Sequence, residues 1–112
     1  MRLAVPLLMF FVAFAAANAG AASVVPSAER QHELVRMVRQ DCGSCHGMTL
    51  NGGLGPALTA KALKERDIPK EALVATIVGG RPGTPMPPWH RFLSEAEAGW
   101  IVDRLLEGFP QQ

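Results

Sequence analysis

The chain has 112 residues, a formal net charge of +1 and 48% hydrophobic side chains. This length is typical of a single domain. Its 11 basic and 10 acidic side chains give no excess of positive charge for binding nucleic acid. It has only two cysteines, and because one motif uses both, none is left for a further disulfide.

The N-terminal segment has the features of an export signal. Arg2 supplies a positive charge, and Leu3 to Ala17 form an apolar run that small residues follow. As a helix this run spans roughly 22 Å, short of the roughly 30 Å core of a bilayer, which favours a cleaved signal over an uncleaved anchor. We therefore predict a signal peptide at residues 1–19 and one mature domain at residues 20–112, without stable membrane insertion.

A first helix, predicted at residues 28–41 with Ser27 as its N-cap, leads into the motif Cys42-Gly43-Ser44-Cys45-His46. Two cysteines three residues apart, with a histidine directly after the second, are typical of covalent attachment of a c-type haem. One helical turn separates the thiols, which suits two vinyl groups along one edge of a porphyrin. The motif therefore predicts haem c bound through Cys42 and Cys45, with His46 as the proximal iron ligand.

Three other interpretations of this motif are less consistent with the sequence. A thioredoxin-like redox pair requires a strand–helix–strand context, and no strand pattern is present. A zinc site needs further ligands at finger-like spacings, and neither His32 nor His90 stands at one. A structural disulfide would leave His46 without a role.

A glycine-rich segment follows at residues 47–58, where regular structure is disfavoured. It contains Gly55-Pro56-Ala57-Leu58, close to His46 in sequence. The Pro56 carbonyl is free to accept a hydrogen bond from the imidazole, which would fix the tautomer and raise the basicity of the ligand. The alternative is an ordinary turn. Met48 is too close to His46 to reach the opposite face of the haem.

Two short helices are predicted next, at residues 59–66 and 69–78. Pro69 suits a first helical turn, and Gly79-Gly80 ends the second of these helices. The second has an apolar face of Leu73, Val74, Ile77 and Val78.

A proline-rich segment at residues 81–93 surrounds Met86. In Thr84-Pro85-Met86-Pro87-Pro88 the prolines restrict the backbone on both sides of the methionine. This restriction suits a thioether aimed at iron, whereas the alternative is a methionine that only packs in a loop. Enough chain separates it from His46 to cross from one haem face to the other. We predict Met86 as the distal ligand, with His90 as the competing candidate.

A last helix is predicted at residues 95–107, where Ser94 and Glu97 form a capping box. Its expected apolar face is Trp100, Ile101, Leu105 and Leu106, and we expect it to cross the first helix. The predicted fold class is therefore all-α, with about four helices wrapped around one covalently attached haem.

With these motifs in place, the mature region resembles the class I c-type cytochromes. The segment from Gly79 to Trp89 is similar to that of cytochrome c55X, a subfamily of small periplasmic cytochromes of denitrifying bacteria. The resemblance implies a small class I cytochrome c fold, the axial ligands and thioether attachments named above, and a dissimilatory cytochrome nitrite reductase as partner. One departure is Arg104, which stands where many relatives carry an aromatic residue.

Iron held by protein ligands on both faces has no open position for a substrate, which favours electron transfer over catalysis. We expect a monomeric electron carrier, not an enzyme, that meets its redox partners over a small, weak interface. Lys61, Lys64, Arg66 and Arg91 are candidates for steering an acidic partner, or else form an ordinary solvated surface. Two other functions stay open: a factor for maturation or activation of the d-type haem of nitrite reductase, and a haem enzyme or ligand sensor with labile Met86.

Overall fold

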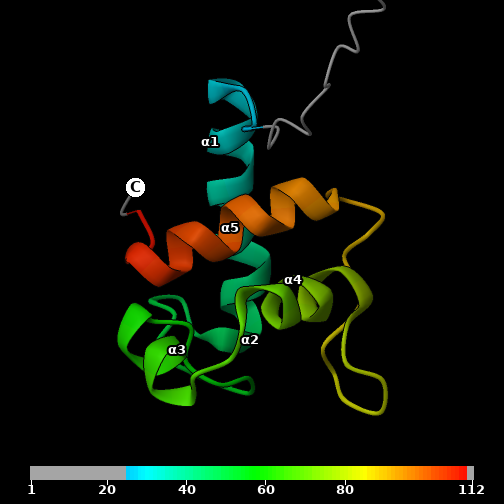
Figure 1. Cartoon of the computed structure of the whole chain (residues 1–112). Coiled ribbons are helices and arrows are strands. Elements are labelled where there is room, and N and C mark those ends of the chain that lie inside the picture. The colour runs from blue at the N-terminus through cyan, green and yellow to red at the C-terminus, as the bar shows by residue number, and fades with distance from the viewer. Residues whose placement is uncertain (1–24, 111–112) are drawn as a thin grey trace, which may run out of the picture.

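The computed structural model describes residues 25–110, and within this range the regular structure is entirely helical (Figure 1). This confirms the predicted all-α fold class. The predicted signal peptide at residues 1–19 lies outside the described residues. Among the helices that are described, none has the length and apolar character needed to cross a bilayer.

The first helix continues from Ser27, its N-cap, to the end of the attachment motif. Its three consecutive parts are α1 (Ala28–Met37), the π-helical turn η1 (Val38–Cys42) and α2 (Gly43–His46). In η1 the Gly43 N–H donates to the Val38 carbonyl, one residue further back than in an α-helix. The sequence predicts this helix only to residue 41, and the extension places both cysteines and His46 on one continuous helix.

Three further helices begin and end within one residue of their predicted bounds. They are α3 (Ala60–Arg66), α4 (Lys70–Gly79) and α5 (Glu95–Glu107). The predicted capping box of α5 is present: Ser94 Oγ accepts the Glu97 N–H, and Glu97 Oε2 accepts the Ser94 N–H, both at 3.1 Å. The local sequence signals therefore determine where these helices begin.

Helix α5 packs on α3 and α4 and contributes much of the core. The buried apolar side chains form one cluster, made of Leu34, Val38, Leu50, Leu63, Val74, Leu93, Ala98, Ile101, Val102 and Leu105. The predicted face of α5 is wrong in part, because Ala98 and Val102 are buried while Trp100 and Leu106 are only half-buried. Arg104 lies over the Trp100 ring, 5.5 Å from its centroid, and so packs on an aromatic surface.

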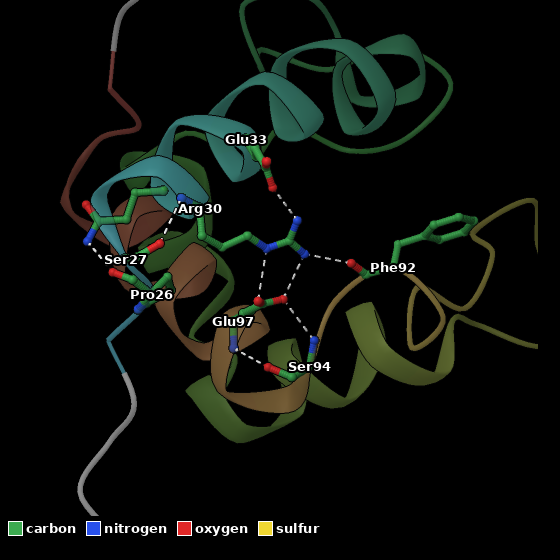
Figure 2. Close-up of polar contacts among 8 residues, drawn as sticks. Pro26, Ser27, Arg30, Glu33, Phe92, Ser94 and Glu97 are labelled. Carbon is green, nitrogen blue, oxygen red and sulfur yellow. Dashed lines mark hydrogen bonds and ion pairs between the residues drawn. The ribbon is translucent and has the colours of Figure 1, made fainter.

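One arginine fastens α1 to the start of α5, which crosses the first helix in Figure 1 as the sequence predicts. Arg30 donates from Nε and Nη2 to the two carboxylate oxygens of Glu97, each at 3.0 Å (Figure 2). Its Nη2 also donates to the Phe92 carbonyl and its Nη1 to Glu33, both at 2.8 Å. A single guanidinium thus joins α1, α5 and the end of the loop between α4 and α5.

Candidate haem site

A cavity of about 510 Å³ lies where α2, the two irregular segments and helices α4 and α5 meet. This volume is in the range of cofactor sites. Every residue predicted for the site contributes to its wall, namely Cys42, Cys45, His46, Pro56 and Met86. The fold therefore brings together groups that the sequence separates by up to half of the domain.

Both cysteines are free thiols on one helix, and both are half-buried. Burial, and to a smaller degree the neighbouring Asp41 carboxylate, raise the pKa of the Cys42 thiol to about 11. Within residues 25–110, no group of three or more His, Cys, Asp and Glu side chains is placed to hold a metal ion. His32 lines a separate groove between α1 and α5, so it does not join the cysteines as a zinc ligand.

The imidazole of His46 is oriented by the expected proline carbonyl. His46 Nδ1 lies 2.7 Å from the Pro56 oxygen, which can only accept a hydrogen bond, so Nδ1 carries the proton. This tautomer leaves Nε2 unprotonated and able to bind iron. The structure thus contains the hydrogen bond that the sequence analysis expects, and it fixes which nitrogen is available.

The glycine-rich segment folds back under the imidazole because the end of α2 holds it there. The His46 and Cys45 carbonyls accept the N–H groups of Gly52 and Gly55, both at 2.8 Å. A Cβ on Gly55 would lie 2.7 Å from Cε1 and 2.8 Å from Nδ1 of His46, so only glycine fits against the ring. Sequence reasoning missed this contact. The available signal was a glycine directly before the proline assigned to support the histidine.

Met86, in the second irregular segment, is half-buried and also lines the cavity. The loop that carries it is closed by the Arg81 N–H, which donates to the Met86 carbonyl at 3.1 Å. The competing candidate His90 is exposed, and Met48 is 68% exposed. The geometry favours Met86 as the distal ligand, and its ligand role stays a prediction.

Several residues that the sequence analysis did not assign to the site also form its wall. Leu54, Ile68 and Thr76 line the cavity, as does Arg66, which donates to the Ala57 carbonyl. The sequence alone suggests Arg66 only as a surface charge for steering a partner. These residues come from different helices and loops, and no local pattern connects them.

The groups that surround the cavity fit a covalently attached haem. Two thiols one turn apart can form the thioether links, and an imidazole nitrogen and a thioether sulfur can bind the iron. Apolar side chains from η1, α3, α4, α5 and the irregular segments line the rest of the wall.

Comparison with known proteins gives the family. Residues 29–103 match the family model described as "Cytochrome C oxidase, cbb3-type, subunit III". The chain is 58% identical over 95 residues to cytochrome c55X of Pseudomonas aeruginosa, covering 85% of this chain and 78% of that protein. The chain belongs to the cytochrome c55X family. It is also 52% identical over 91 residues to cytochrome c55X of Stutzerimonas stutzeri, covering 81% of this chain and 79% of that one.

Solved structures agree with this membership. The c-type cytochrome NirC is 61% identical with a TM-score of 0.70, over 73% of this chain and 94% of NirC. The dihydro-heme d1 dehydrogenase NirN, in complex with DHE, is 31% identical with a TM-score of 0.59, over 69% of this chain but 16% of NirN. As a c-type cytochrome, the protein is an electron carrier rather than an enzyme, and the family implies haem c as its cofactor.

Proposed function

We propose that this cytochrome carries single electrons to a dissimilatory cytochrome nitrite reductase in the periplasm, as part of denitrification. The observation that supports a carrier most strongly is that His46 and Met86 line one cavity beside the two attachment cysteines. Haem c bound there supplies an iron that cycles between the ferric and ferrous states. Membership of the cytochrome c55X family supports the choice of reductase.

The roles of the protein residues follow from their positions. Cys42 and Cys45 would attach the porphyrin. The Pro56 carbonyl holds the Nδ1 proton of His46, so Nε2 would be the nitrogen that binds the iron. Met86 would supply the second protein ligand to the iron and would so exclude water and small substrates. A thioether ligand stabilises ferrous iron and raises the reduction potential, so we expect a positive potential that suits donation to a terminal reductase.

The surface around the cavity mouth suits a brief protein contact. Leu54 and Ile68 belong to the cavity wall and are 78% and 37% exposed, and Met48, close to the attachment motif, is 68% exposed. Exposed apolar residues beside a redox centre support a small, weak interface. Lys61 and Lys64 lie on the exposed face of α3, where they would steer an acidic partner.

A second candidate function is a role in maturation or activation of the d-type haem of nitrite reductase. The likeness to the dehydrogenase NirN favours it, because its name describes oxidation of a dihydro-haem d1. Such an oxidation releases electrons, and a small cytochrome is a suitable acceptor. In this function the same site would receive electrons instead of donating them.

Stopped-flow mixing separates the two directions. The reduced cytochrome is mixed with oxidised cytochrome nitrite reductase, and the oxidised cytochrome with a dihydro-haem d1 dehydrogenase and its substrate. We expect fast oxidation by the reductase that slows with salt and is several-fold slower in Leu54→Ser. Val25 is 66% exposed but lies outside the cavity wall, so Val25→Ser is the matched control. No acceleration by the reductase would contradict the proposed partner, and fast reduction by the dehydrogenase alone would favour the second candidate.

A further inference from the structure

The end of helix α4 lies unusually close to the loop that carries Met86, drawn in yellow in Figure 1. Gly80 is the C-cap of α4, with φ of 67° and ψ of −170°. A Cβ on Gly80 would lie 2.7 Å from the carbonyl carbon of Pro87 and 2.8 Å from the carbonyl oxygen of Met86. Both are backbone atoms, so neither can rotate away as the end of a side chain can.

Backbone hydrogen bonds close this loop onto the same end of α4. The Arg81 N–H donates to the Met86 carbonyl at 3.1 Å, and the Trp89 N–H donates to the Ile77 carbonyl at 3.0 Å. The last carbonyls of a helix have no partner within it, and the returning loop supplies one. The loop around Met86 is therefore held at two points at the end of α4, the contact with its C-cap Gly80 and the hydrogen bond from Trp89 to Ile77.

We infer that Gly80 is a positioning residue for Met86, because its missing side chain lets the Met86 backbone rest on α4 and so sets how far the thioether reaches into the cavity. This inference rests on the proposed function, in which Met86 binds iron. An ordinary Cβ contact is 3.4 Å or more. Any other residue at position 80 must therefore push the backbone of the Met86 loop away from its Cβ, which would otherwise lie 2.7 Å from the Pro87 carbonyl carbon. A shift of roughly 0.7 Å exceeds the roughly 0.5 Å within which a functional group must be held.

The same loop provides a matched control. Gly83 also has a left-handed backbone, with φ of 80°, but nothing lies within 4 Å of the position that its Cβ would take. Alanine at position 80 or at position 83 carries the strain of a positive φ. Only alanine at position 80 also pushes against the backbone of Met86 and Pro87.

The test is a titration of the ferric holoprotein with imidazole, which competes with the thioether for iron. Gly80→Ala is expected to lower the apparent Kd of imidazole at least about tenfold, which corresponds to about 1.4 kcal/mol. Gly83→Ala is expected to stay within about twofold of the wild type, because its Cβ displaces nothing. A role in stability alone would shift the unfolding midpoints of both variants and leave imidazole binding the same in both.

Each remaining outcome also decides the question. If Gly80→Ala yields no holoprotein, Thr84→Val replaces it: Thr84 is exposed, and its Oγ1 lies 2.7 Å from the Arg81 carbonyl and 3.3 Å from the Met86 N. The inference requires that the backbone of this loop sets the position of the Met86 thioether, so tighter imidazole binding by Thr84→Val supports it and unchanged binding overturns it. Equal binding by the two alanine variants overturns the inference alone. A wild-type protein without sulfur bound to iron overturns the proposed function together with it.

Discussion

Replacing Arg30 with methionine removes the guanidinium that joins three parts of the fold and keeps most of the apolar stem (Figure 2). The lost contacts are the paired bonds to Glu97, each at 3.0 Å, the bond to the Phe92 carbonyl and the bond to Glu33, both at 2.8 Å. Glu97 keeps only the Ser94 N–H at 3.1 Å. The substitution therefore leaves a partly buried carboxylate without its cation.

The structure sets the expected magnitude. Arg30 and Glu97 are 29% and 21% exposed, so their paired bonds are worth about 1–2 kcal/mol after solvent screening. The bond to the Phe92 carbonyl adds about 1 kcal/mol, and Glu33, one turn away on α1, adds about 0.3 kcal/mol. We expect Arg30→Met to lower the free energy of unfolding by about 2–3 kcal/mol and Tm by about 10–20 °C.

The assay is denaturant unfolding of the holoprotein, followed by circular dichroism, for Arg30→Met, Glu97→Gln and the double variant. The double-mutant cycle should give a coupling energy of about 1–1.5 kcal/mol. Lys61→Met is the control, because Lys61 approaches Glu65 only to 3.9 Å and the two side chains are 86% and 66% exposed. A coupling energy indistinguishable from zero, or an equal loss of stability in the control, would show that Arg30 and Glu97 do not stabilise the fold as a pair.

Three further predictions concern acid stability, the fit of Gly55 against His46 and the folding of the chain without haem. Arg30 holds the pKa of Glu97 below its ordinary value. The stabilisation from this pair is therefore complete above the ordinary glutamate pKa of about 4.3 and is lost as pH falls through the lowered pKa of the folded protein. Unfolding curves of Glu97→Gln at different pH values should lack this part of the acid dependence, and pH profiles identical to the wild type would contradict it. Gly55→Ala should weaken the iron–imidazole bond and lower holoprotein yield, whereas Gly79→Ala, whose Cβ would meet nothing within 4 Å, should have the yield and Soret spectrum of the wild type. A Cys42→Ala, Cys45→Ala variant should be largely unfolded because two long irregular segments surround the cavity; native helix content by circular dichroism would reject this.

The helix bounds could be predicted because their signals are local. The Ser94–Glu97 capping box and the N-caps Ser27 and Thr59 each lie within the first turn of the helix that they begin. The π-helical turn η1 could not be predicted, because hydrogen bonds that reach back five residues instead of four leave no distinct pattern in the sequence. It is nevertheless the turn that leads into the attachment motif.

Burial in the loops depends on contacts between distant parts of the chain. Leu50 is 2% exposed and has a φ of 59°, although it stands in a segment that the sequence marks only as irregular. The Leu58 N–H donates to the Leu50 carbonyl at 2.8 Å, so this segment folds on itself and inserts Leu50 into the core. Val102 was missed for a related reason, since the buried stripe of α5 depends on which face α3 and α4 cover.

The site shows the same division. The hydrogen bond between His46 and Pro56 was predictable, because only ten positions of glycine-rich chain separate them and keep the Pro56 carbonyl near the imidazole. The contact of Gly80 with the Met86 backbone was not, because Gly80 looked like an ordinary helix terminator. Sequence patterns indicated the residue types suited to a haem. The structure identified Gly55 and Gly80, whose missing side chains allow close contact with the His46 ring and the Met86 backbone.

In the proposed site, a sulfur atom from Met86 and a nitrogen atom from His46 would both bind the iron. Iron K-edge X-ray absorption of the oxidised holoprotein can identify both atoms, because the fine structure distinguishes sulfur from nitrogen around the metal. We predict a sulfur neighbour in the wild type that disappears in Met86→Ala, while His90→Ala retains it. A first shell of nitrogen alone in the wild type, or an unchanged sulfur signal after Met86→Ala, would contradict the account.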